Sequence, residues 1–161
     1  MENLVLLHVG CANRYVEGFI NSDKRTAWNG HENKLDLVMD LGQVWPYEDE
    51  SVDGIVSMHV FQQLTWRELL VAFSEVKRVL KPGGVMRMGV PMVEIKDKSL
   101  NYFLGWNNIN LFSFDLLKQV LIDRMGFSEI SNKRFGHSEL PELAKLDNRQ
   151  NRGTHYIEII K

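Results

Sequence analysis

The chain has 161 residues, of which 44% are hydrophobic and 25% charged, and its formal net charge is −2. This composition argues against a disordered chain, and the near-neutral charge gives no general attraction for nucleic acid or for anionic lipid. No apolar run approaches the length of a membrane span, and the run at Leu4–Leu7 is too short for a signal peptide. One cysteine excludes an intramolecular disulfide, and the five histidines lack the spacing of metal ligands. We therefore expect a single cytoplasmic domain over residues 1–161, without a metal.

The first half of the chain predicts a series of short buried strands. Four apolar runs carry this prediction: Leu4–Val9, Phe19–Ser22, Leu37–Met39 and Gly54–Met58. The first run is closed by Gly10, as expected for a strand that is buried on both faces. The second and third are followed at once by Asp23 and Asp40. Carboxylates therefore stand at the carboxyl ends of two successive strands.

The next segment predicts a helix with a defined start and end. Thr65 and Glu68 form a capping box, in which the threonine hydroxyl accepts a backbone N–H and the glutamate reaches back. Apolar residues follow at helical spacing on one face: Leu69, Phe73, Val76 and Leu80. Lys81–Gly84 (KPGG) ends this helix, expected over Trp66–Leu80, and turns the chain into a strand at Val85–Val90.

The last third of the chain predicts one more helix and two strands. The helix is expected over Phe114–Met125, with Ser113 as its N-cap and Gly126 just past its end. Two final strands follow: Phe127–Lys133 and His155–Ile160. The remaining long stretches lack a regular pattern and are expected to be irregular: Pro91–Phe112 and Arg134–Thr154.

Strands separated by crossovers predict an α/β fold, with a doubly wound, mostly parallel sheet and an antiparallel C-terminal strand. Both expected helices belong to the second half of the sheet and so cover one face. The stretch Lys24–Lys34 is polar and a poor helix, which leaves the other face with reduced helices. Either a second subunit covers that face or the C-terminal segment does so with Phe135, Leu140, Leu143 and Leu146. We expect the second subunit, in a homodimer.

Candidate binding residues stand at the carboxyl ends of the strands, where doubly wound sheets bind their ligands. Gly10 opens a small-residue turn that lets backbone approach a ligand, although such turns also occur without one. Asp23 lies 13 residues after Gly10 (23 − 10), where a carboxylate can accept both hydroxyls of a ribose. On spacing alone, an N-cap or an exposed turn explains Asp23 equally well.

Three segments together resemble class I S-adenosylmethionine-dependent methyltransferases of the short type 11-like group: LHVGCAN…GFINSD, LDLVMDLGQVWPYEDESVDGIVSMHVFQQL and SEVKRVLKPGGVMRMGVP. The resemblance covers Leu6–Pro91 and resumes more faintly from Gly126. It implies a Rossmann-like transferase with S-adenosylmethionine as cofactor. The methyl group would pass to an oxygen or nitrogen acceptor, such as a sugar or another small molecule.

The resemblance also implies a role for each residue after the first two strands. The backbone of Gly10, Cys11 and Ala12 would pass along the methionine and ribose of the cofactor. The carboxylate of Asp23 would bind the ribose hydroxyls.

The later strand ends would complete the cofactor site. Asp40 and Leu41 would lie beside the adenine. Ser57, Met58 and His59 would face the methionyl end and the methyl group. Because its imidazole titrates near neutral pH, His59 is the candidate catalytic base, unless it only hydrogen-bonds backbone at a helix entry.

Two departures from the group bear on catalysis. Ala12 replaces the usual second glycine, and Gln62-Gln63 replace a common Glu-His pair. The second departure favours an alternative, a catalytically silent S-adenosylmethionine-binding subunit that supports a partner enzyme. A nicotinamide-dependent dehydrogenase is disfavoured because the full G-x-G-x-x-G pattern is missing.

The long stretch Pro91–Phe112 holds aromatic and amide side chains. They include Tyr102, Phe103, Trp106, Asn107, Asn108 and Asn110. Such side chains either grip a sugar or a base, or form a lid that packs on itself.

Overall fold

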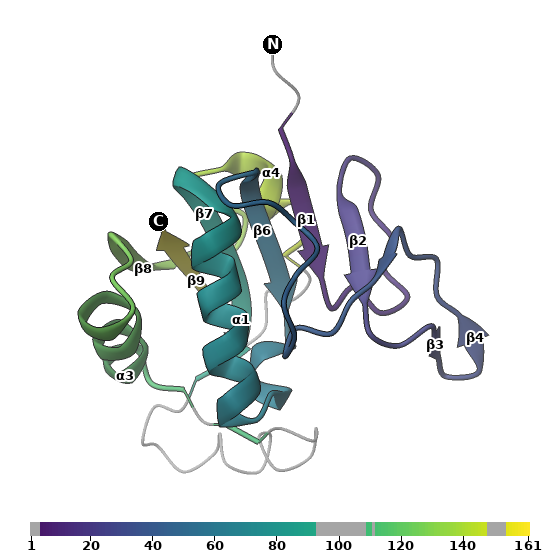
Figure 1. Cartoon of the computed structure of the whole chain (residues 1–161), viewed down its shortest axis with the longest axis horizontal. Coiled ribbons are helices and arrows are strands. Elements are labelled where there is room, and N and C mark those ends of the chain that lie inside the picture. The colour runs from purple at the N-terminus through teal and green to yellow at the C-terminus, as the bar shows by residue number, and fades with distance from the viewer. Residues whose placement is uncertain (1–3, 93–108, 111, 148–153) are drawn as a thin grey trace.

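Seven strands form one sheet, in the order β5-β2-β1-β6-β7-β9-β8 (Figure 1). They belong to a computed structural model that describes residues 4–92, 109–110, 112–147 and 154–161. The strands are β1 (Leu6–Val9), β2 (Ile20–Asp23), β5 (Leu37–Val38), β6 (Val52–Met58), β7 (Leu80–Pro91), β8 (Glu129–Lys133) and β9 (Thr154–Ile160). All seven correspond to a strand predicted from the sequence, with small shifts at most ends. The start of β7 differs most, because Leu80 already pairs with Val52 before the KPGG turn.

The sheet is doubly wound and mostly parallel, as predicted. β1 pairs in parallel with both β2 and β6, and β5 and β7 extend the parallel part outward. β9 runs antiparallel to both β7 and β8. The chain moves from β1 out to β5 on one side and then crosses to β6 on the other. The strand order therefore reverses between β1 and β6, which is where sheets of this kind bind ligands.

Helix α1 (Trp66–Val79) begins and ends close to the predicted residues. Both hydrogen bonds of the capping box are present: Glu68 N–H donates to Thr65 Oγ1, and Thr65 N–H donates to Glu68 Oε2. The buried face of α1 carries Leu69, Ala72, Phe73, Val76 and Val79. These side chains pack on the apolar residues of β1, β6 and β7, in the larger of two hydrophobic clusters.

The second predicted helix is α3 (Phe114–Lys118), which continues as the π-helical turns of η2 (Gln119–Arg124). Ser113 caps its start by accepting the Leu116 N–H, and Gly126, at φ +71°, follows its end. Both α1 and α3 lie on the same side of the sheet (Figure 1). Within the described ranges, no helix is long and apolar enough to cross a membrane.

The opposite face of the sheet is covered by the C-terminal segment. The expectation that this segment is irregular was wrong in part, because Pro141–Ala144 form the short helix α4. Leu143 and Leu146 are fully buried there, in a second hydrophobic cluster with Leu6, Val56, Met58, Val85 and Tyr156. Phe135 remains 40% exposed. The sequence left two ways to cover this face, a second subunit or the C-terminal segment. The structure shows the C-terminal segment there.

A buried ionic network holds the C-terminal segment on this face. The guanidinium of Arg87 on β7 contacts Asp147 (Nη2 to Oδ2, 2.6 Å) and Glu158 (Nη1 to Oε1, 2.9 Å), with all three side chains at most 1% exposed. Arg87 also donates to the backbone carbonyls of Arg134 and His137. Because every partner is satisfied, the network can remain charged in the interior and fix where the segment lies.

Turns replace helices in the first half of the chain. Lys24–Lys34 holds the small hairpin of β3 (Ala27–Trp28) and β4 (His31–Glu32), so the prediction that it is not a helix is confirmed. Of the stretch Pro91–Phe112, residues 93–108 and 111 lie outside the described residues, and so do Tyr102, Phe103, Trp106, Asn107 and Asn108.

Candidate functional site

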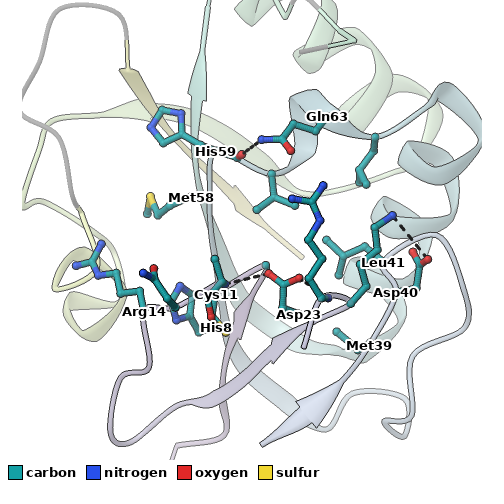
Figure 2. A pocket seen from close by; sticks show the side chains of 17 residues that line it. His8, Cys11, Arg14, Asp23, Met39, Asp40, Leu41, Met58, His59 and Gln63 are labelled. Carbon is teal, nitrogen blue, oxygen red and sulfur yellow. Dashed lines mark hydrogen bonds and ion pairs between the residues drawn. The ribbon is translucent and has the colours of Figure 1, made fainter. Parts of the chain in front are cut away.

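The segments that follow β1, β2, β5 and β6 surround a cavity of about 390 Å³ (Figure 2). This volume lies within the range of about 300–1,000 Å³ that is typical of small-molecule sites. Eight of the nine predicted site residues line it: Gly10, Cys11, Ala12, Asp23, Asp40, Leu41, Met58 and His59. The cavity lies at the point where the strand order reverses, so the fold and the candidate residues indicate the same place.

The turn after β1 depends on Gly10. Its φ of +69° favours glycine, and a Cβ there would lie 2.3 Å from Val60 Cγ2. The backbone N–H groups of Gly10 and Cys11 both donate to the Ser22 carbonyl, which joins the turn to β2. Burial raises the pKa of the Cys11 thiol to about 11, so the thiol stays protonated and is not a nucleophile near neutral pH.

The carboxylate of Asp23 links two turns at the edge of the cavity. Its Oδ2 accepts the Ala12 N–H at 2.9 Å, and its Oδ1 accepts the Arg25 N–H at 2.8 Å. Asp23 is therefore a turn residue that also lines the cavity. Each carboxylate oxygen can accept more than one hydrogen bond, so both retain capacity for a ligand.

Asp40 and Leu41 form the far end of the cavity. Asp40 Oδ1 accepts the Gly42 N–H at 2.9 Å, and Oδ2 lies 3.9 Å from Lys24 Nζ. The buried side chains of Met39 and Leu41 add an apolar surface beside this carboxylate. An apolar surface with a hydrogen-bond acceptor at its rim suits a flat heterocycle that carries an amino group.

His59 follows directly after β6 with a left-handed backbone, at φ +62°. This conformation costs energy for a residue with a side chain, and residues of this kind concentrate at functional sites. The His59 N–H donates to the Gly89 carbonyl at 2.8 Å, while the imidazole Nε2 lies 3.3 Å from Thr154 Oγ1. The backbone of His59 thus makes the structural contact, and its ring is positioned by β9.

The two glutamines that replace the usual Glu-His pair differ in their side-chain contacts. Gln63 Nε2 donates to the His59 carbonyl at 2.8 Å and so holds the backbone at the cavity rim (Figure 2). The main-chain carbonyl of Gln62 accepts the N–H groups of Ile109 and Asn110, whereas its buried side-chain Oε1 has no hydrogen-bond partner within the described residues. Gln62 is buried and does not line the cavity.

Three further residues show where the sequence prediction and the structure differ. Ser57, the ninth predicted site residue, is 1% exposed and does not line the cavity. His8 and Arg14 do line it and were not predicted as site residues. A signal for His8 exists in the sequence, because it interrupts an otherwise apolar strand two residues before Gly10. In the described part of the chain, no cluster of side chains is arranged to hold a metal ion.

Comparison with family models gives one match, to the model described as "Methyltransferase domain", over residues 7–88. The chain belongs to this methyltransferase family. The matched residues span the strands β1 to β7 and therefore contain most of the cavity wall. Comparison of the methyltransferase with curated proteins gives no match.

Solved structures with the same fold include the following three, each 16% identical to this chain. A SAM-dependent methyltransferase from Archaeoglobus fulgidus has a TM-score of 0.69, covering 98% of this chain and 86% of that chain. A chain from the complex between the Haloferax volcanii Trm112 methyltransferase activator and a methyltransferase has a TM-score of 0.65, with 99% and 83% covered. An S-adenosylmethionine-dependent methyltransferase from Mesorhizobium loti has a TM-score of 0.64, with 99% and 91% covered. At this identity the likeness shows the fold.

Proposed function

We propose that the cavity binds S-adenosylmethionine and that the chain transfers its methyl group to an oxygen or nitrogen atom of a small-molecule acceptor, such as a sugar. The observation that carries this proposal is the order of groups along one cavity. Asp40 and Leu41 lie at one end, Asp23 in the middle, and Cys11 at the other end (Figure 2). That order matches an adenine, a ribose and a methionyl chain in succession.

The cofactor would be held mainly by residues of the first two strand ends. Asp23 can accept ribose hydroxyls, because its oxygens keep acceptor capacity beside their two backbone bonds. The Gly10 turn lets backbone lie close to the cofactor, and the bound cofactor supplies an electrophilic methyl group.

The expected effect of Asp23→Ala is a loss of about 1–3 kcal/mol in binding of S-adenosylhomocysteine, because ribose hydroxyls lose their acceptor. Asp123→Ala is the matched control, since Asp123 is exposed on η2 and does not line the cavity. Calorimetric titration of both variants measures the difference. Equal affinity of Asp23→Ala and Asp123→Ala would contradict this placement of the ribose.

His59 is proposed as the base that accepts the acceptor's proton. Its imidazole lines the cavity, and the contact with Thr154 Oγ1 restricts the ring orientation. A positioned base contributes about 10²–10⁴-fold to a rate. We therefore expect His59→Ala to lower kcat within this range while the affinity for S-adenosylhomocysteine stays nearly unchanged. If the kcat of His59→Ala equalled that of the wild type, His59 would be a structural residue and not the base.

A catalytically silent S-adenosylmethionine-binding subunit is the second candidate. The likeness to a methyltransferase solved together with an activator supports it, and so do Gln62 and Gln63 in place of Glu-His. Turnover panels of sugars, other small molecules and nucleic acids separate the two candidates. Formation of S-adenosylhomocysteine by the purified chain supports the enzyme, whereas cofactor binding without turnover on any panel supports the silent subunit.

We further propose that residues 1–161 act as one cytoplasmic domain and that the chain forms a homodimer. Leu143 and Leu146 cover the sheet face opposite α1 and α3, which was the face expected to form the dimer interface. A homodimer therefore has to form through another surface. Light scattering behind a sizing column measures the assembly. A monomer at micromolar concentration would contradict the homodimer.

A further inference from the structure

The backbone of His59 is held by a hydrogen bond on each side of the residue. Its φ of +62° lies in the left-handed region, which is unfavourable for a residue with a side chain. The His59 N–H donates to the Gly89 carbonyl of β7 at 2.8 Å. The His59 carbonyl accepts from Nε2 of Gln63, also at 2.8 Å (Figure 2). The unfavourable conformation is therefore maintained by contacts to two other parts of the chain.

Gln63 is brought to this carbonyl by the short 3₁₀ turn η1 (Phe61–Gln63). Phe61 is fully buried in the larger hydrophobic cluster, which anchors the start of the turn. The main-chain carbonyl of Gln62 accepts two N–H groups from the segment at residues 109–110. Because the backbone of η1 is fixed in this way, the Gln63 side chain approaches His59 from a defined position.

The contact requires a donor at position 63. A carbonyl oxygen can only accept, so the amide of Gln63 faces His59 with its Nε2. Histidine, which commonly stands at this position in the related group, also carries an N–H donor at the end of its ring. Glutamine in its place therefore keeps a donor for the His59 carbonyl.

A third element contacts the imidazole of His59. The ring Nε2 lies 3.3 Å from Oγ1 of Thr154, the first residue of β9. Gln63 and Thr154 thus hold different parts of His59, the main-chain carbonyl and the ring. With the bond to Gly89, contacts from η1, β9 and β7 fix the direction of a side chain that lines the cavity.

We propose that Gln63 and Thr154 are positioning residues for His59, and that Gln63 affects methyl transfer through His59. Gln63 would keep the His59–Val60 peptide in place, and Thr154 would keep the ring aimed at the acceptor. A reacting group that is misplaced by about 1 Å can cost about 10²-fold in rate. This inference rests on the proposed role of His59 as the base. It also means that Gln63, although it replaces a histidine, is compatible with turnover.

Gln63→Met tests the proposal, because methionine has a similar length and no donor. Its kcat should fall by about 10–100-fold, whereas its affinity for S-adenosylhomocysteine should change by less than about twofold. Gln63→His restores a donor and should recover most of the kcat. Thr154→Val removes the hydroxyl at nearly constant shape and should give the same pattern as Gln63→Met.

A double variant separates positioning from a direct role of Gln63. In a His59→Ala background, Gln63→Met should lower kcat by less than about a further twofold, because residues that act as a unit are not additive. An equal loss with and without the His59 imidazole would overturn the inference. Gln119→Met is the matched control and should leave kcat unchanged, since Gln119 is exposed on η2 and does not line the cavity.

The NMR signal of the His59 ring reports its position without turnover. The Cε1–H resonance of His59 is identified by its loss in His59→Ala. It should shift in Gln63→Met and in Thr154→Val but not in Gln119→Met. A wild type without turnover would contradict the proposed enzyme, and these shifts would still support the positioning. An unchanged resonance in Gln63→Met together with an unchanged kcat would overturn the inference and leave the cofactor site intact. If Gln63→Met misfolds and loses S-adenosylhomocysteine binding, Thr154→Val and Gln63→His carry the same test.

Discussion

Acidification from pH 7 to pH 5 should destabilise the fold through His8. The pKa of this imidazole is lowered from 6.5 to about 4, mainly by burial. Between these values the unfolded chain binds a proton that the folded chain does not, so the free energy of unfolding falls as the pH falls. With respect to His8, the free energy of unfolding has its full value above pH 6.5 and falls progressively as the pH falls toward 4.

The magnitude follows from the size of the pKa change. A change from 6.5 to about 4 is worth about 3.4 kcal/mol at its limit, at 1.36 kcal/mol for each pH unit. About 2 kcal/mol of this is lost by pH 5. Carboxylates with lowered pKa values, such as Asp53 and Glu75, lose their contribution to the free energy of unfolding at lower pH. They therefore affect the comparison between pH 7 and pH 5 little.

Urea unfolding followed by tryptophan fluorescence at pH 7, 6 and 5 measures the effect. His8→Asn is the matched control, because its Nδ2 can take the place of His8 Nδ1, which lies 3.1 Å from Asn21 Oδ1, and asparagine does not titrate. The wild type should lose about 2 kcal/mol more than His8→Asn between pH 7 and 5. Parallel curves for the two proteins would refute the conclusion that His8 is buried in its neutral form.

Three substitutions test the packing around the site, each by urea unfolding at pH 7. Arg87→Met should cost about 3–5 kcal/mol, because it leaves two buried carboxylates without their cation. Thr65→Ala should cost about 1 kcal/mol through loss of the α1 cap, and an unchanged midpoint would contradict the cap. Gly10→Ala should cost about 1–3 kcal/mol from strain and from the contact with Val60, and adding Val60→Ala should recover only the contact part.

Much of the fold could be predicted because its signals are local. The capping box of Thr65 and Glu68 and the N-cap Ser113 depend on residues within one turn, and both are present. The strand predictions depend on apolar runs in the sequence, and all seven predicted strands pair in the main sheet. The sequence did not decide what covers the second face of the sheet. Leu143 and Leu146 are placed there by a contact between Arg87 and Asp147, which lie 60 residues apart in sequence.

The site could be predicted where a residue's position at a strand end was enough. Asp23 is the last residue of β2, Asp40 lies two residues after the end of β5, and both line the cavity. Ser57 does not, because successive strand residues point to opposite faces and its neighbour Met58 takes the cavity side. Arg14 was overlooked because its anchor, the Leu146 carbonyl, is distant in sequence.

Calorimetric titration of the wild-type chain with S-adenosylhomocysteine tests the central claim most directly. The cavity at the ends of β1, β2, β5 and β6 predicts saturable binding of one ligand per chain, and NAD under the same conditions should give no binding heat. Absence of heat and of any thermal shift at millimolar S-adenosylhomocysteine would contradict the claim that this methyltransferase-family chain uses the cavity for its cofactor.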